Sequence, residues 1–379
     1  MSGEELVTKV KRQSYRAMCA SGGPILSALA ALWLAGCSPQ ADAQASADPG
    51  VPEGVLISTE ACERNSAVGT IVYVSGYGYS ASAGQLDVFL AKEMGYFDAL
   101  CLDVEINAGG ANGQQLVSSG QAQFTALGSA SDVILAAANS SNLTAVATYG
   151  TTSPFSIFAH EDVTSLKELE GRKLGYFINI TPIAKAMLDS AGVDVSKVEL
   201  IRMTNYDPTV VTRGQVDAIV GYASNQPERL RAMGLPFNEF RPADYDLQGT
   251  YNVMEVNTQF LNENREVVAD FMRATLKALH HCLDDEADCV ERISVLAEEN
   301  NQGSAFPADQ QARTWAVEAG WVRATGKAPG VQSIADWEAE HAMVAQYGDL
   351  RTLPAIEDMM DPDLVASLYV DGELQWPGE

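Results

Sequence analysis

The sequence predicts a two-lobed α/β protein. Its 379 residues exceed what one hydrophobic core usually holds, so two lobes are expected. After Thr70, short β-branched runs alternate with helical patterns, which is typical of a mostly parallel sheet flanked by helices. The polar segment 149–154, which contains Gly and Pro, interrupts this alternation and is expected to be a hinge between the lobes.

Each element is predicted from its hydrophobic period. Strands are expected over residues 71–74, 102–106, 123–127, 143–148, 155–159, 173–177, 198–202, 218–220 and around 253–257. Helices are expected over residues 84–94, 114–119, 131–138, 182–191, 208–213, 226–233, 264–283, 287–298, 308–322, 334–347 and 362–369. The segment 235–247 is expected to be irregular.

The stretch 75–106 contains the first candidate binding loop. A loop rich in aromatic residues, Gly and Ser follows the strand at 71–74 and precedes the helix at 84–94. In an open α/β sheet, ligands bind outside the carboxyl ends of the strands. The candidate ligand contacts in this loop are Tyr77, Tyr79, Ser80 and Ser82.

Small hydroxyl residues recur where loops lead into helices. Backbone N–H groups at a helix start lack partners within the helix and can receive an anionic or carbonyl group. This adds as candidates Ser129, Ser131, Asn179 and Thr181. The alternative is that Ser131 and Thr181 only cap their helices, with Pro182 at the first helical position.

Aromatic side chains gather at the same predicted strand ends. A planar ring held between aromatic faces would suit such a cleft. The aromatic candidates are Tyr77, Tyr79, Tyr149, Phe177, Tyr206 and Tyr222, whereas Phe89 and Phe97 are expected in the core. The loops around these candidates contain no Arg or Lys, while Asp132 and Asp207 lie close in sequence. This favours a neutral or weakly basic heteroaromatic ligand over an oxyanion.

The N-terminus has the features of an export signal. Basic residues precede an apolar run at 24–35 that is too short to span a bilayer, and Leu34-Ala35-Gly36-Cys37 follows. This resembles a bacterial lipoprotein signal, with residues 1–36 removed and Cys37 lipidated. Residues 37–66 are then expected to form a flexible tether. The alternative is a plain secretory signal with an incidental cysteine.

Four further cysteines remain after Cys19 and Cys37 are set aside. In an oxidising compartment we expect two disulfides, Cys62 with Cys101 and Cys282 with Cys289. Three pairings are formally possible. The alternative is a metal site built from His280, His281, Cys282 and Cys289, although this spacing matches no structural zinc pattern.

Charge and motifs exclude several classes of protein. The net charge of −26 makes nucleic-acid binding improbable, because such a surface repels phosphate. No nucleophile elbow, P-loop or H-E-x-x-H motif is present, and the four histidines have no evident catalytic partners. The sequence therefore predicts a non-enzymatic protein without a cofactor.

Several segments resemble one family of transport proteins. The run AKEMGYFDALCLDVEI, the following GQAQFTALGSASDV, and later SLKELEGRKLGYF, RGQVDAIVGYASNQPERL and TYNVMEVNTQFLNENREVVADFMRA are similar to the solute-binding proteins of ABC importers. Within that family the chain is most similar to the group that carries thiamine-pyrimidine precursors, sulfonates, taurine or nitrate. The resemblance covers roughly residues 70–279.

This resemblance implies a periplasmic-binding-protein (type II) fold with two hinge crossings. Lobe 1 would comprise residues 67–151 and 252–379, and lobe 2 residues 152–251. It also adds Thr152 at the first crossing and Asn225 at the cleft, while Gln226 stands where the thiamine-pyrimidine group often has Glu. The expected protein is a monomeric, extracytoplasmic lipoprotein that delivers a small nutrient to a permease and its ATPase. The alternative is a sensor lobe with the same fold.

Overall fold

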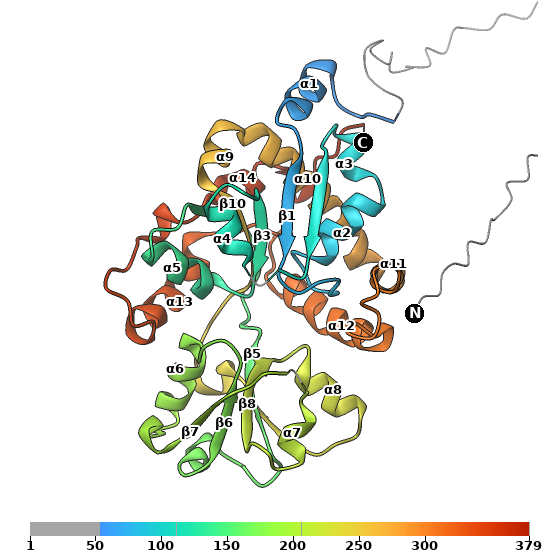
Figure 1. Ribbon diagram of the computed structural model, residues 1–379. Coiled ribbons are helices and arrows are strands. Elements are labelled where there is room, and N and C mark those ends of the chain that lie inside the picture. The colour runs from blue at the N-terminus through green and yellow to red at the C-terminus, as the bar shows by residue number, and fades with distance from the viewer. Residues whose placement is uncertain (1–53, 111, 206, 379) are drawn as a thin grey trace, which may run out of the picture. The chain divides into compact units, whose positions relative to one another are not determined.

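The computed structural model describes residues 54–110, 112–205 and 207–378 (Figure 1). Within them lie two five-stranded sheets and a short two-stranded ribbon of β11 (Tyr369–Val370) and β12 (Glu373–Leu374). Helices flank both larger sheets, so the predicted two-lobed α/β class is confirmed. No helix in these residues is both long and apolar enough to span a bilayer.

The first sheet is built from two separate parts of the sequence, one before and one after the strands of the second sheet. Its spatial order is β2 (Val104–Ala108), β1 (Ile71–Ser75), β3 (Phe124–Leu127), β10 (Tyr251–Asn257) and β4 (Leu143–Gly150). β1 pairs in parallel with β2 and β3, and β10 runs antiparallel to both β3 and β4. All strands except β10 therefore run in one direction, which brings their carboxyl ends to one edge.

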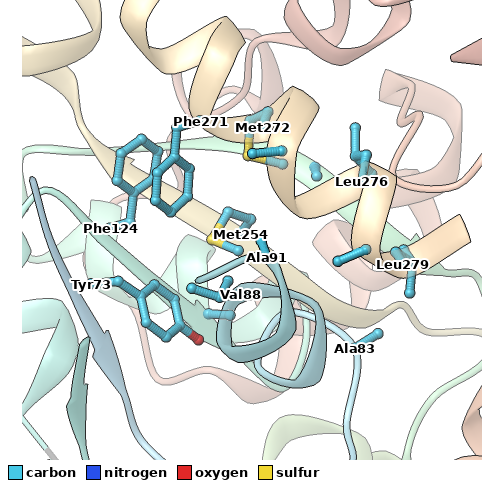
Figure 2. Packing of buried hydrophobic residues seen from close by; sticks show 14 of the residues in the cluster. Tyr73, Ala83, Val88, Ala91, Phe124, Met254, Phe271, Met272, Leu276 and Leu279 are labelled. Atoms are coloured by element: carbon cyan, nitrogen blue, oxygen red, sulfur yellow. The ribbon is translucent and has the colours of Figure 1, made fainter. Parts of the chain in front are cut away.

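The helices of this first lobe pack on the sheet or on one another, and many of their apolar residues are buried. They are α1 (Thr59–Ala67), α2 (Leu86–Glu93), α3 (Tyr96–Ala99), α4 (Gly113–Ser118), α5 (Ala130–Ala138), α9 (Thr258–Glu263), α10 (Arg265–Asp284), α11 (Glu286–Glu299), α12 (Ala308–Ala324), α13 (Ile334–Tyr347) and α14 (Pro362–Ala366). The core forms where α2 and α10 cover the sheet, and Phe124 stacks on Phe271 there (Figure 2). Phe89 and Phe97 are buried in this core, as predicted.

The second sheet has the same pattern with fewer helices. Its order is β7 (Glu199–Arg202), β6 (Lys173–Tyr176), β8 (Ala218–Tyr222), β5 (Phe155–Ala159) and β9 (Asn238–Phe240). β5 runs antiparallel to β8 and β9, and the other strands share one direction. The helices beside it are η1 (Leu166–Leu169), α6 (Pro182–Ser190), η2 (Val195–Lys197), α7 (Thr209–Thr212), α8 (Gln226–Ala232) and η3 (Pro242–Tyr245). β9 lies in the segment predicted to be irregular.

The chain passes between the sheets twice. The first crossing lies between β4 and β5, at the predicted hinge, and the return lies between η3 and β10. β4 and β10 are neighbours in the first sheet, and Tyr251 pairs with Gly150 at their ends. The two crossings are therefore adjacent. The lobe boundaries at residues 151 and 252 remain a prediction.

The predicted tether extends too far toward the C-terminus. Residues assigned to it form α1, whose Cys62 is joined to Cys101. The Asn65 side chain is fully buried and donates to the Leu100 carbonyl at 2.7 Å. Any tether therefore ends before Thr59. Cys37 and residues 1–36 lie outside the described residues.

Both predicted disulfides are confirmed. Cys62 bonds to Cys101 and Cys282 bonds to Cys289. The second bond uses the two thiols that the alternative metal site would need. His281 instead lies 2.7 Å from an Asp288 carboxylate oxygen, and no group of His, Cys, Asp and Glu in the described ranges could hold a metal ion.

Candidate functional site

The two sheets approach each other at the carboxyl ends of β1 and β8. Tyr77, in the loop after β1, shares a hydrogen bond of 3.2 Å with the hydroxyl of Tyr222, the last residue of β8. Their rings meet edge to face, with centroids 5.9 Å apart. The Tyr222 hydroxyl also lies so close to Gly128 that a Cβ there would be 1.9 Å from it. Position 128 therefore has to be glycine for this contact to form.

A second contact between the lobes is made by the buried carboxylate of Glu318 on α12. Ser224, just beyond β8, donates its hydroxyl to Glu318 Oε1 at 2.6 Å, and Tyr251 of β10 donates to the other oxygen. Thr314, one turn earlier on α12, donates to the Ser224 carbonyl at 3.0 Å. Burial raises the pKa of Glu318 to about 7. The hydroxyls of Ser224, Tyr251 and Ser82 and the Ala83 backbone N–H act in the opposite direction and favour the charged form.

Ser82, Tyr251 and Asn252 form a buried network beside this carboxylate. The Ser82 hydroxyl lies 3.2 Å from the Tyr251 hydroxyl, and Asn252 Nδ2 donates to Ser82 Oγ at 3.0 Å. Among the described residues, none forms a hydrogen bond with the buried Asn252 Oδ1, and the Asn252 backbone has φ of 36°. An orphaned acceptor and a left-handed backbone are features that cluster at ligand sites. Asn252 therefore joins the candidates.

The start of α5 is satisfied by protein groups. Ser129, not Ser131, is the N-cap and forms a capping box with Asp132. Ser131 instead donates its backbone N–H to Glu340 Oε1 at 2.9 Å and its hydroxyl to the same oxygen. These donors, which were predicted to face a ligand, have a protein acceptor instead. Thr181 does cap α6, accepting from the Ala184 N–H at 3.4 Å.

We call the region where Tyr77 meets Tyr222 and Ser224 meets Glu318 the junction of the lobes. Buried carboxyl groups dominate the electrostatics on the first-lobe side of this junction. Burial, with a smaller contribution from Glu340, raises the pKa of Asp132 to about 7. Burial also raises the pKa of Glu255 on β10 to about 8, with Asp132 adding to the effect against a hydrogen bond from Gln114. Burial therefore favours the neutral form of both acids, and a charge on either one disfavours a charge on the other.

A basic residue lies at the corresponding edge of the second sheet. Arg202 ends β7 and donates its Nε to the Phe177 carbonyl at 3.3 Å. It lines a hollow of about 450 Å³ together with Phe177, Ile178, Met203 and Thr204. Arg202 belongs to a strand both in the prediction and in the structure, so the expectation that the loops at the presumed cleft contain no Arg or Lys stays a prediction.

The predicted contacts divide between the junction and other places. Close to the junction lie Tyr77, Ser82, Ser129, Ser131, Tyr222 and Asn225, whose carbonyl accepts from Gln310 at 3.4 Å. Tyr79 instead stacks on Phe89 at 4.4 Å, and its neighbour Ser80 is half-buried. Thr152 and Asn179 are exposed. Tyr206 lies outside the described residues.

Sequence reasoning missed Ser224, Asn252, Glu318 and Glu340. Glu318 and Glu340 lie on helices, where Glu is normally a solvent-facing residue. The available signal was their position on the apolar stripe, since Glu318 falls between buried Trp315 and Val322 and Glu340 between buried Trp337 and Val344. A carboxyl group on the buried face of an amphipathic helix needs hydrogen-bond donors from the rest of the protein, because it has lost its contacts with water.

Comparison with known proteins identifies the family. The family profile described as NMT1/THI5 like matches residues 84–288, more than half of the chain. The chain belongs to the NMT1/THI5-like family. It is also 29% identical over 233 residues to the formylaminopyrimidine-binding protein of Halalkalibacterium halodurans, a match that covers 59% of this chain and 69% of the relative.

Two further similarities extend this assignment. The riboflavin-binding protein RibY of Chloroflexus aurantiacus is 29% identical over 142 residues, covering 35% of this chain and 40% of the relative. The fold is shared with the periplasmic aliphatic sulphonate binding protein SsuA of Escherichia coli, with a TM-score of 0.57 and 11% identity over 76% of this chain and 90% of that one. This NMT1/THI5-like chain is thus similar in sequence to two solute-binding proteins and shares its fold with a third.

Proposed function

We propose that the chain is the extracytoplasmic binding subunit of an ABC importer and that it holds a small heteroaromatic solute between its lobes. The observation that carries the proposal is the meeting of the Tyr77 and Tyr222 hydroxyls across the two sheets. Two tyrosine rings at the carboxyl ends of strands suit a planar aromatic ligand. Relatives named for a formylaminopyrimidine and for riboflavin support this class of ligand.

The ligand contacts would come from both lobes. From the first lobe we propose Tyr77, Ser82 and Asn252, whose orphaned Oδ1 can accept from a ring amino group. From the second lobe we propose Tyr222 and Asn225. Tyr79, Ser80, Ser129, Ser131, Thr152, Asn179, Thr181 and Tyr206 remain as predicted contacts with less support from the geometry. Closure around the ligand would occur at the two adjacent crossings, and the permease would recognise the closed form.

The cellular setting is part of the same proposal. We propose that residues 1–36 are removed on export and that lipid on Cys37 anchors a monomeric protein to the membrane. Two disulfides agree with an oxidising compartment outside the cytoplasm. Globomycin, an inhibitor of the lipoprotein signal peptidase, should cause an uncleaved precursor to accumulate, and Cys37→Ser should release the protein from the membrane.

A second candidate ligand is an aliphatic sulfonate. Arg202 and its hollow favour this reading, because a guanidinium is the side chain best suited to an oxyanion. The fold shared with the sulphonate-binding protein is compatible with it. The buried carboxyl groups of the first lobe count against it.

A thermal-shift screen of residues 38–379 would test the proposed ligand class. The panel would hold pyrimidines, thiamine, flavins, taurine, alkanesulfonates and nitrate. A ligand at about 100 times its Kd should stabilise the protein by roughly 2.7 kcal/mol. We expect the melting temperature to rise with a heteroaromatic compound. A rise with sulfonates alone would contradict the proposed ligand and support the second candidate.

A further inference from the structure

Glu340 of α13 occupies the position at the start of α5 where a bound anion would lie. Its Oε1 accepts from the Ser131 backbone N–H at 2.9 Å and from the Ser131 hydroxyl. The neighbouring Ala130 N–H donates to Thr250 Oγ1 at 2.7 Å. The first-turn donors that an external anion would need are therefore already in use.

The other carboxylate oxygen of Glu340 also accepts two hydrogen bonds. Oε2 accepts from the Thr250 backbone N–H at 2.7 Å and from the Thr250 hydroxyl at 2.7 Å. Glu340 is 3% exposed, and no ion pair to an Arg or Lys is formed by it within the described residues. Backbone N–H groups and hydroxyls around a desolvated carboxylate, without a cation, are the surroundings of an anion-binding site.

This carboxylate belongs to the same corner as the proposed ligand site. Gly128, directly before the α5 N-cap, is in contact with the Tyr222 hydroxyl. Thr250 precedes Tyr251 and Asn252 at the return crossing. Asp132, on the first turn of α5, has its pKa raised by burial and by Glu340. A second anion here would face the Glu340 carboxylate with little water to screen it.

We propose that Glu340 is the resident anion of the cleft, and that by filling the α5 helix start it excludes anionic solutes and restricts the protein to neutral or cationic ones. This inference rests on the proposed function for the location of the ligand. It assigns specificity to a residue of the C-terminal helix α13 that need not touch the solute. Glu340 would repel anionic solutes, whereas Tyr77 and Tyr222 would supply the attractive contacts with the accepted solute.

Chemical rescue of Glu340→Ala provides the test. The substitution removes a CH₂–COO⁻ fragment, which acetate reproduces. Acetate should raise the melting temperature of the variant by several degrees in a saturable manner, beyond the effect of chloride at equal ionic strength. Wild type and Glu338→Ala, a matched change at an exposed residue of the same helix, should respond equally to the two salts. Isothermal titration should detect methanesulfonate binding to Glu340→Ala, at least ten-fold tighter than to wild type.

Two results would overturn the proposal. One is an equal response of Glu340→Ala to acetate and chloride, and the other is wild type binding methanesulfonate as tightly as the variant does. If Glu340→Ala does not fold in chloride, recovery of its circular dichroism spectrum in acetate supports the proposal and lack of recovery counts against it. Failure of the proposed function is distinct, because then no heteroaromatic solute would bind wild type even though acetate rescued the variant.

Discussion

The two lobes bring different chemistry to the edge where they meet. The first lobe contributes buried carboxyl groups on separate elements, from Asp132, Glu255, Glu318 and Glu340. The second contributes uncharged groups of Tyr222, Ser224 and Asn225, with Arg202 farther along its edge. In the proposed function, the first lobe would determine which charge is tolerated, and the second would complete the contacts with the solute.

The lobes also differ in covalent bracing. Both disulfides lie in the first lobe, and the sequence has no cysteine between residues 152 and 251. Burying a carboxyl group costs free energy, and the stabilisation from the two disulfides can offset that cost in the first lobe. Among the described residues of the second lobe, the groups that reach the first lobe through Tyr222, Ser224 and Asn225 are uncharged.

Removing the Cys62–Cys101 bond should have the largest effect. The bond closes a loop with a sequence separation of 39, so Cys62→Ser with Cys101→Ser should lower the free energy of unfolding by about 4 kcal/mol. The shorter Cys282–Cys289 loop should be worth about 2.5 kcal/mol. Urea titration at fixed pH measures both. An unchanged Kd for ligand in the folded variants would confirm that the bracing is remote from the site, and a large loss would contradict it.

The pH dependence of stability should identify Glu318 as a group that folding keeps protonated. Burial raises its pKa from 4.5 to about 7, so its contribution to stability is present below pH 4.5 and is lost as the pH rises through about 7. Glu318→Gln cannot ionise. As the pH rises from 4.5 to about 7, the free energy of unfolding of Glu318→Gln should therefore fall by about 3 kcal/mol less than that of wild type.

The control for this titration is Glu338→Gln, which replaces an exposed carboxyl group. The pH profile of Glu338→Gln should overlay that of wild type, because this variant retains Glu318. Asp87, Asp132 and Glu255 titrate in wild type and in both variants, so their contribution cancels in the comparison. A Glu318→Gln profile parallel to wild type would show that Glu318 is solvated in solution.

These buried acids show where prediction from sequence stopped. Strand and helix order, both disulfides and the hinge position followed from hydrophobic period, cysteine context and Gly/Pro placement. Short elements such as β9 were missed because they lack a full period. The roles of Glu318 and Glu340 depend on contacts with residues far away in the chain, Ser224 and Ser131, which no local pattern encodes.

Tyr222 and Gly128 test the close approach of the lobes. In Gly128→Ala the new methyl group would collide with the Tyr222 hydroxyl, so closure should be impaired and ligand Kd should rise at least ten-fold. Adding Tyr222→Phe removes the colliding oxygen and should recover part of that loss. Calorimetric titration of the two variants decides the point. If the second change makes binding worse instead, the collision is not what impairs closure.

Arg202→Gln should have the smallest effect. Arg202 lies in its own hollow at the edge of the second sheet, so the affinity for a neutral heteroaromatic solute should change less than about two-fold. Lys185→Gln, a cation of the same lobe whose Nζ lies 2.9 Å from the Tyr347 carbonyl, serves as a comparison for non-specific loss of charge. A loss of more than ten-fold in Arg202→Gln alone would transfer charge recognition to the second lobe.

The central claim is that both lobes hold one solute through the Tyr77 and Tyr222 pair. A double-mutant cycle of Tyr77→Phe and Tyr222→Phe, measured by isothermal titration with the best heteroaromatic ligand of the screen, tests it most directly. Because the hydroxyls lie 3.2 Å apart, each change should weaken binding several-fold, and the double variant should lose clearly less than the sum of the single free-energy changes. Unchanged affinity in both single variants would place the ligand elsewhere and contradict this account.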